Sequence, residues 1–215
     1  MNLSKKLFLS FVLLCTSIFL FAESLTLNSV CNSLSKNAVT KGNFTQTKMV
    51  NIAKSSREFK STGNFLFCSK GIIWNTEKPF PSRMIISESK ISQTNSSGET
   101  TVISSGNNPT LGLISSTLTG IFSGDISSLE NIFNIEFSAN EANNSWQINL
   151  FPKDENFSKI IESIFISGNF IESSTQLENI VLTEKNNNTI KYILENQTVA
   201  KELTKDEEKF FESSN

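Results

Sequence analysis

The sequence predicts a mainly β protein with helices: an incomplete, highly curved antiparallel β-barrel, or half-barrel, with an N-terminal helix and a helical plug in its concave face. Two observations predict this fold. Short apolar or alternating segments, separated by turns rich in Gly, Asn and Ser, recur in meander order between residues 43 and 198. Residues 25–39 and 109–122 instead have helical spacing of apolar residues, so helices precede and interrupt the strands.

The first 22 residues are predicted to be a cleaved secretory signal peptide. Lys5 and Lys6 precede an apolar run, and Ala22 is a small residue at the place where a signal peptidase would cut. An uncleaved membrane anchor is the alternative, but the apolar run is short for a transmembrane helix. Residues 23–215 are therefore expected to form one exported domain.

Composition excludes several classes of function. The chain has 215 residues and a net charge of -2, and removal of two lysines with the signal peptide leaves -4. A mildly acidic chain without a basic stripe is not expected to bind nucleic acid. The chain contains no histidine, and its glycines form no phosphate-binding pattern. We therefore expect no enzyme, no metal site and no cofactor.

The first elements are expected to be a helix and a strand. Residues 25–39 place apolar side chains on one helical face, and Gly42 breaks the pattern. Phe44 begins an apolar and polar segment typical of a strand, which extends to residue 52. The polar segment 55–63 is expected to be a turn that leads into the next strand.

The segment that follows, residues 65–81, has apolar residues on both faces. Phe65 and Phe67 alternate with Leu66, so this strand is expected to be covered on both sides. A Ser-Lys-Gly turn leads to a second strand, which ends after Trp74 where two prolines remove backbone donors.

The centre of the chain changes from strands to helices. Residues 83–105 are expected to contain two or three further strands. Pro109 then begins a helix that is rich in Gly, Ser and Thr, which makes it marginal unless its apolar stripe is buried. A short second helix at residues 127–134 is expected to begin with a capping box of Ser127 and Glu130.

Strands return in the C-terminal third. A hairpin is expected over residues 135–150, and a short helix that continues into a strand over residues 155–170. Two further strands flank the triple-Asn turn at residues 186–188. A capping box of Thr204 and Glu207 begins the last helix, which ends the chain with a pair of phenylalanines.

Phenylalanine is the residue type that the chain has in excess, with 18 Phe beside a single Tyr. Phe brings a large apolar area without a polar group, so these side chains either fill a core or line a site for an apolar ligand. For any single Phe the core is the expected place. A sheet that is apolar on its inner face and covered by a Gly- and Ser-containing helix, however, is typical of a concave lipid site with a movable plug.

Two cysteines, Cys31 and Cys68, remain after the signal peptide. An exported protein can form a disulfide between them, and two separate buried thiols are the alternative. Spacing alone does not decide between the two, because a bridge requires the Cα atoms to lie within about 6 Å of each other.

The order of these segments resembles the LolA-like family of periplasmic outer-membrane lipoprotein carriers, and its divergent branch more than its founding members. The resemblance covers nearly all of the predicted mature chain, and the helical segment inside the barrel is matched by residues 107–125. The other matching positions are Phe44 and Gln46 in the first strand, Gly63, Phe65, Ile72, Trp74 and Pro79 in the next two, and Trp146, Ile148, Leu150, Pro152 and Lys153 later in the chain.

The resemblance implies a periplasmic carrier that binds the acyl chains of lipoproteins in a hydrophobic cavity and shuttles them from the inner to the outer membrane. Its implied partners are an inner-membrane lipoprotein-releasing transporter and an outer-membrane receptor, and a monomer is expected. We expect the cavity to be lined by Phe44, Phe65, Phe67, Ile73, Trp74, Ile85, Leu111, Ile114, Leu118, Ile121, Phe122, Ile148 and Leu150.

One turn departs from the family pattern. Many carriers have an Arg-Pro or Lys-Pro pair before the Trp strand, and that arginine helps to hold the plug closed. In this chain the turn has only Lys70 as a substitute. The resemblance therefore implies that Lys70 is the residue to examine for a contact with the plug.

Two other functions fit the same residues. A non-transporting half-barrel could sense lipid or protein, and a β-rich structural protein of the cell surface could pack all its phenylalanines internally. Bound acyl lipid in the purified protein would favour the carrier.

Overall fold

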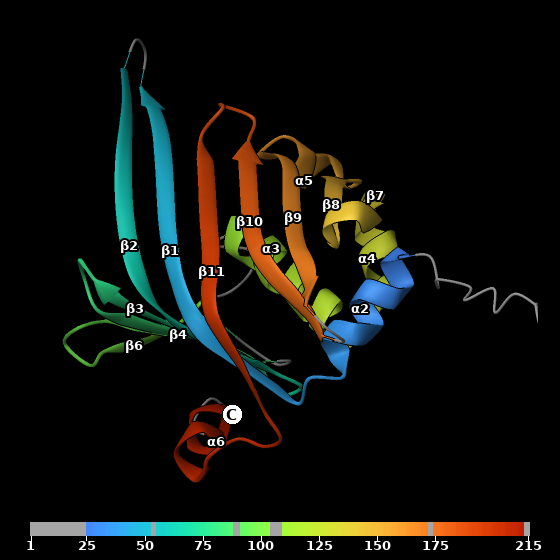
Figure 1. Ribbon diagram of the computed structural model, residues 1–215. Helices are drawn as coiled ribbons and strands as arrows, with labels where there is room; N and C mark the ends of the chain where they lie inside the picture. The colour runs from blue at the N-terminus through green and yellow to red at the C-terminus, as the bar shows by residue number, and fades with distance from the viewer. Residues whose placement is uncertain (1–24, 53–54, 88–90, 104–108, 172–173, 213–215) are drawn as a thin grey trace, which may run out of the picture.

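The computed structural model describes residues 25–52, 55–87, 91–103, 109–171 and 174–212 (Figure 1). Its strands are β1 (Val39–Ile52), β2 (Ser55–Cys68), β3 (Gly71–Lys78), β4 (Ser82–Ser87), β5 (Ile91–Thr94), β6 (Thr100–Ile103), β7 (Phe133–Asn140), β8 (Ser145–Pro152), β9 (Ile161–Ile171), β10 (Ser174–Glu184) and β11 (Thr189–Ala200). Its α-helices are α2 (Leu27–Ser35), α3 (Pro109–Ser123), α4 (Ile126–Ile132), α5 (Glu155–Ser158) and α6 (Lys205–Glu212).

The strands form one antiparallel sheet of 11 strands in the order β6-β5-β4-β3-β2-β1-β11-β10-β9-β8-β7. Neighbours in the sheet are neighbours in the chain, except that β1 pairs with β11 at the centre. The edge strands β6 and β7 do not pair with each other, so the barrel is not closed. This confirms the predicted fold class.

The sheet curves around α2, α3 and α4, which occupy its concave side (Figure 1). Buried residues of these helices, such as Val30, Leu118 and Leu129, join one large apolar cluster with residues of both halves of the sheet. Helix α3 also packs against α2 and α4. It therefore has the position predicted for the plug.

A smaller apolar cluster lies on the convex side. It consists of Val39, Leu66, Ile73, Ile85 and Phe211, and Phe211 belongs to the C-terminal helix α6. The capping box predicted for this helix is present, because Thr204 N donates to Glu207 Oε2 at 2.8 Å and Glu207 N to Thr204 Oγ1 at 3.3 Å.

Three local predictions were wrong. The segment predicted as a turn at residues 55–63 is the first part of β2, because it pairs with β1 through a register that extends to Ile52 and Ser55. The first helix, predicted over residues 25–39, spans only Leu27–Ser35. The cap of α4 is Asp125, whose side chain accepts from Ser128 N at 3.0 Å.

The predicted signal peptide lies outside the described residues. None of the helices in the described part of the chain is both long and apolar enough to cross a membrane.

Candidate functional site

The centre of the concave face is an aromatic cluster built by strand alternation. Phe65 and Phe67 point to the same side of β2, with ring centroids 4.6 Å apart. Trp74 lies opposite Phe65 in the register of β2 and β3. The Phe44 ring centroid lies 4.5 Å from that of Trp74, and Tyr192 packs edge-on to Trp74 at 5.0 Å. Three neighbouring strands and β11 therefore present one continuous aromatic surface.

Two glycines make room for this surface. A Cβ atom at Gly42 would lie 2.7 Å from Phe65 Cζ, and one at Gly63 would lie 2.9 Å from Phe44 Cε1. Both distances are shorter than van der Waals contact. The two rings can occupy the space beside the neighbouring strand only because these positions have no side chain.

The helix that covers the aromatic surface carries no charged residue along its sequence, PTLGLISSTLTGIFS. Leu113, Leu118 and Ile121 of α3 are buried, and the Phe122 ring lies 4.3 Å from the ring of Phe67. Thr117 is only 1% exposed, and its hydroxyl donates to Leu113 O at 2.7 Å. Because the helix satisfies its own hydroxyl, a polar residue can face an apolar site at little cost.

Ten of the thirteen residues predicted to line the cavity belong to the large apolar cluster of the concave side or pack against it. They are Phe44, Phe65, Phe67, Trp74, Ile114, Leu118, Ile121, Phe122, Ile148 and Leu150. Leu111 belongs to α3, but its side chain lies outside the described residues.

The structure does not bring Ile73 and Ile85 to the concave face. They are partners in the register of β3 and β4, and both belong to the convex cluster beneath α6. The physical reason is alternation: Trp74 points inward, so Ile73 must point outward. Counting in twos from Trp74 selects Ile72, which does lie in the concave cluster, as does Ile86 on β4.

The residue predicted to hold the plug contacts another helix. Lys70 Nζ donates to Glu208 Oε1 of α6 at 3.3 Å, so its ion pair fixes the C-terminal helix. Lys70 also lines a pocket of about 440 Å³, between the β2–β3 turn and the end of α3, together with Phe67 and Phe122. Lys70 therefore shares a pocket with the end of the plug, while its ammonium group pairs with α6.

Cys31 and Cys68 are free thiols, so the disulfide alternative is wrong. The sheet separates them, because Cys31 lies on α2 at the concave side while Cys68 packs against the convex cluster. Burial raises the pKa of the Cys31 thiol to about 11 and raises that of Cys68 as well. Both are expected to remain protonated at neutral pH.

A few polar atoms lie within the apolar concave face. Burial raises the pKa of Tyr192 to about 12, although part of the residue reaches solvent. Trp146 Nε1 and Thr175 Oγ1 have no hydrogen-bond partner among the described residues, and both residues are at most 2% exposed. Such atoms can donate to a carbonyl group that enters with an apolar ligand.

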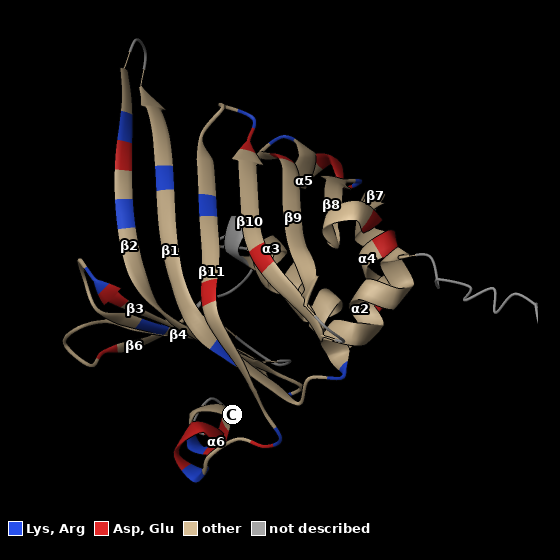
Figure 2. Ribbon diagram, viewed as in Figure 1, with Lys and Arg blue, Asp and Glu red and all other residues tan. Residues whose placement is uncertain are grey.

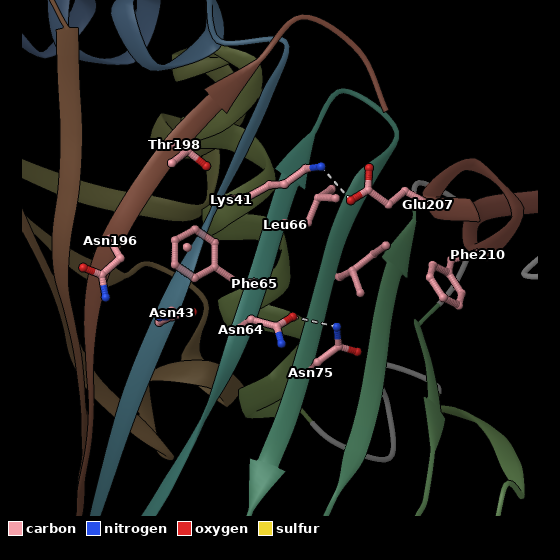
Figure 3. Close-up of a pocket in the computed structure, with 12 residues that line it drawn as sticks. Lys41, Asn43, Asn64, Phe65, Leu66, Asn75, Asn196, Thr198, Glu207 and Phe210 are labelled. Atoms are coloured by element: carbon pink, nitrogen blue, oxygen red, sulfur yellow. Dashed lines mark hydrogen bonds and ion pairs between the residues drawn. The ribbon is translucent and has the colours of Figure 1, made fainter. Parts of the chain in front are cut away.

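The convex face has a pocket of a different kind beside α6, with a volume of about 380 Å³ (Figure 3). Lys41 Nζ lies 2.7 Å from Glu207 Oε1 there, and Asn75 donates to Asn64 at 2.8 Å. Burial acts to raise the pKa of Glu207, but hydrogen bonds from Lys41 and Thr204 outweigh it, and the net pKa is lowered. Amide groups and the ion pair line this pocket together with Phe65, Leu66, Ile73 and Phe210, so an acyl chain bound there would cover polar groups without forming hydrogen bonds to them.

Arg83 connects this pocket to the terminal helix. Its guanidinium lies 4.0 Å from the centroid of the Phe210 ring, and its Nε donates to Asn75 at 2.7 Å. The convex polar groups therefore hold α6 against the sheet.

Solved structures resemble this chain to different degrees. A DUF1329 family protein from Desulfovibrio piger has a TM-score of 0.50 and 8% identity, over 87% of this chain and 95% of that one. A LolA superfamily protein from Nitrosomonas europaea has a TM-score of 0.47 and 8% identity, over 87% and 98%. A putative outer membrane lipoprotein-sorting protein domain from Vibrio parahaemolyticus has 0.47 and 10%, over 87% and 95%. At 8% identity, the similarity to the Desulfovibrio piger protein concerns the fold alone.

No curated protein matches the sequence. The family model of the outer membrane lipoprotein carrier protein LolA matches residues 35–211, which is most of the chain. Proteins of this kind are carriers and binding proteins. The chain therefore belongs to the LolA family of outer membrane lipoprotein carrier proteins.

Proposed function

We propose that this protein is a periplasmic carrier that binds the acyl chains of lipoproteins on its concave face and shuttles them from the inner to the outer membrane. The observation that carries the proposal is an aromatic surface covered by an uncharged helix. Phe67 and Trp74 are buried in that surface, and α3 covers it without any ion pair of its own. An apolar ligand can replace such a cover, because both make the same kind of contact.

Shielding is the physical purpose of such a carrier. Each CH₂ group that leaves water contributes about 0.8 kcal/mol, so an acyl chain does not cross an aqueous compartment unaided. Binding requires α3 to move away from the aromatic surface, and release requires it to return. Exchange is fast only if the open and closed forms are close in free energy. The backbone of α3 supports this, because Gly112 and Gly120 each weaken the helix by roughly 1 kcal/mol relative to alanine.

Quenching of Trp74 tests whether acyl chains reach the concave face. The chain has two tryptophans, so Trp146→Phe leaves Trp74 as the single indole fluorophore. Titration with 9,10-dibromostearic acid is expected to quench Trp74 strongly, because bromine must come close to the ring to act. A matched titration of the Trp74→Phe variant, which keeps Trp146, reports how far the ligand extends under β8 to β10.

The carrier and sensor functions separate in the cell. Depletion of a carrier is expected to leave outer-membrane lipoproteins in the inner membrane. Acyl binding together with normal lipoprotein sorting would favour the sensing half-barrel. Absence of Trp74 quenching would contradict the carrier and a lipid sensor, and would leave a protein-sensing half-barrel or a structural protein of the cell surface.

A further inference from the structure

The far half of the β1–β2 hairpin extends beyond the rest of the sheet (Figure 1). β1 pairs with β11 only as far as Met49, whereas its pairing with β2 continues to Ile52 and Ser55. β2 pairs with β3 only from Thr62 onward, so its outer edge is unpaired from Ser55 to Ser61 in the described chain. Residues 50–52 and 55–57 therefore form a two-stranded ribbon that other strands do not flank, although Asn51 N donates to Asn188 Oδ1 of the β10–β11 turn at 2.8 Å.

One face of the outer half of the hairpin, which includes this ribbon and the adjoining Lys48 and Phe59, combines apolar and basic side chains. Alternate residues share a face, so the side of β1 that carries Phe44 carries Lys48, Val50 and Ile52 further out. The register places Phe59 opposite Lys48, and Arg57 opposite Val50. We call the resulting set the hairpin face: Lys48, Val50, Ile52, Arg57 and Phe59.

The apolar members of the hairpin face are unusually accessible. Phe59 is 55% exposed and Ile52 is 52% exposed, whereas Phe44, Phe65 and Phe67 of the concave cluster are at most 2% exposed. Large apolar side chains that are exposed together on a projecting ribbon indicate an interaction surface.

The basic members of the hairpin face are not neutralised. No ion pair among the described residues involves Lys48 or Arg57, whereas Lys60 on the opposite face lies 2.9 Å from Glu58. The whole chain has a net charge of -2, so this positive region contrasts with its surroundings. Figure 2 shows basic positions on β1 and β2 here, with one acidic position between those of β2, while several acidic residues lie on α6.

From these observations we infer that the hairpin face docks the protein on the surface of an anionic phospholipid bilayer. Lys48 and Arg57 attract the phosphate groups, while Phe59 and Ile52 enter the boundary between headgroups and acyl chains. The free backbone edge of β2 stays among the hydrated headgroups, because unpaired peptide groups are excluded from hydrocarbon.

A partner strand is a poorer occupant of this edge. Arg57, Glu58 and Lys60 follow each other closely on β2, and charged side chains on an edge strand oppose the addition of another strand. A bilayer uses the same basic residues favourably.

Docking in this way would direct the concave face toward the membrane. Phe44 and Ile52 lie eight residues apart on the same face of β1, which corresponds to roughly 26 Å. The inference does not depend on acyl binding, since the hairpin face lies outside the aromatic cluster.

Co-sedimentation with vesicles tests the inference. The purified protein is expected to bind vesicles of phosphatidylglycerol and phosphatidylcholine, to bind pure phosphatidylcholine far more weakly, and to dissociate as NaCl is raised. Lys48→Gln combined with Arg57→Gln is expected to weaken binding about 25-fold, since each basic residue near the surface contributes about a factor of five. Ile52→Ser combined with Phe59→Ser is expected to weaken it at least about tenfold.

Matched controls use residues of the same kind elsewhere. Lys60→Gln removes a charge from the opposite face of β2, and Val199→Ser removes an apolar side chain that is also 55% exposed. Both are expected to change binding less than about twofold. All substituted side chains of the hairpin face are exposed or half-buried, and melting temperatures equal to that of the wild type would confirm that each variant folds.

Two results would overturn the inference. One is equal, salt-insensitive binding to vesicles with and without phosphatidylglycerol. The other is an equal loss of binding in the hairpin variants and the controls. Quenching of Trp74 by dibromostearic acid is expected to be unchanged in the hairpin variants, so failure of docking remains distinguishable from failure of acyl binding.

Discussion

The two faces of the sheet are covered in different ways. On the concave side, α3 contributes apolar contacts such as Phe122 on Phe67 and has no charged residue with which to form a tether. On the convex side, α6 is only eight residues long but has ion pairs from Glu207 to Lys41 and from Glu208 to Lys70.

The difference indicates which cover can be exchanged. Apolar contact is non-directional, so a ligand with enough apolar area can substitute for the concave cover. Ion pairs and the Arg83–Phe210 contact require particular partners, so the convex cover is specific to α6. We therefore expect an acyl ligand to replace α3 and not α6.

The largest difference between the faces is expected in stability. Phe67→Ala removes a ring that packs on Phe65 and Phe122, and it should lower the free energy of unfolding by about 3–5 kcal/mol. Phe211→Ala should lower it by only about 1–2 kcal/mol, because a short terminal helix can detach while the sheet stays folded. Chemical denaturation measures both values. Equal losses would contradict the distinction between a global concave core and a local convex one.

Alkaline pH is expected to act on the concave side. The raised pKa values of Cys31, about 11, and Tyr192, about 12, mean that the folded state holds these protons more tightly than the unfolded state. Stability is then complete below about pH 9 and falls as pH rises, through the range 9–11 for Cys31 and 10–12 for Tyr192. Melting temperatures measured from pH 8 to 12 should show this decline. Tyr192→Phe should flatten its upper part, and an unchanged profile in that variant would argue against the assignment.

A smaller effect, on the affinity for an acyl ligand, is expected from a substitution in the buried face of α3. Thr117→Val replaces a buried hydroxyl with a methyl group and should stabilise the closed form, which lowers the affinity for dibromostearic acid by up to about fivefold. Ser116→Ala is the matched control, because the Ser116 hydroxyl also bonds within the helix but is exposed. Tighter binding by the Thr117 variant would contradict a plug that must open.

The smallest effect is expected at the convex ion pair. Lys41 and Glu207 are partly exposed, so a double-mutant cycle of Lys41→Gln and Glu207→Gln should give a coupling below about 1 kcal/mol. Because the pKa of Glu207 is lowered on folding, this contribution is present above its ordinary value of 4.5 and is lost as pH falls through the lowered pKa. Acyl binding should not change in either variant, and a change would link the two faces.

Alternation of residues along the strands predicts most of the concave face from the sequence. It fails in β3 and β4, where the sequence does not show which side of the strand faces inward. Phe65 and Phe67 lie on the concave face together, as the alternation on either side of Leu66 predicts. Ile73 and Ile85 were misassigned because apolar residues occupy both faces of β3 and β4, and only the helix α6 explains the outer ones. The sequence of α6 does not indicate which part of the sheet it will cover.

The hairpin was missed for a different reason. Residues 55–63 are polar, so composition indicated a turn, yet they form a strand because they pair with β1. Backbone pairing stabilises such a ribbon without burial. Periodicity of apolar residues indicates which residues are buried, but it does not reveal a strand that is held by backbone pairing without burial. Only the register of β1 and β2 shows that the basic and exposed apolar residues of this segment lie on one face.

The pairing of β1 with β11 has a consequence for the order of folding. The first and last strands meet at the centre of the sheet, so the aromatic surface lacks Tyr192 and its neighbours until the final strand arrives. Contacts between such distant segments form slowly, because the chain loses the entropy of closing a long loop before the contacts contribute any stabilisation. A chain that emerges from the ribosome N-terminus first would form the two halves of its sheet separately, and the proposed acyl site would be complete only after β11 had joined them.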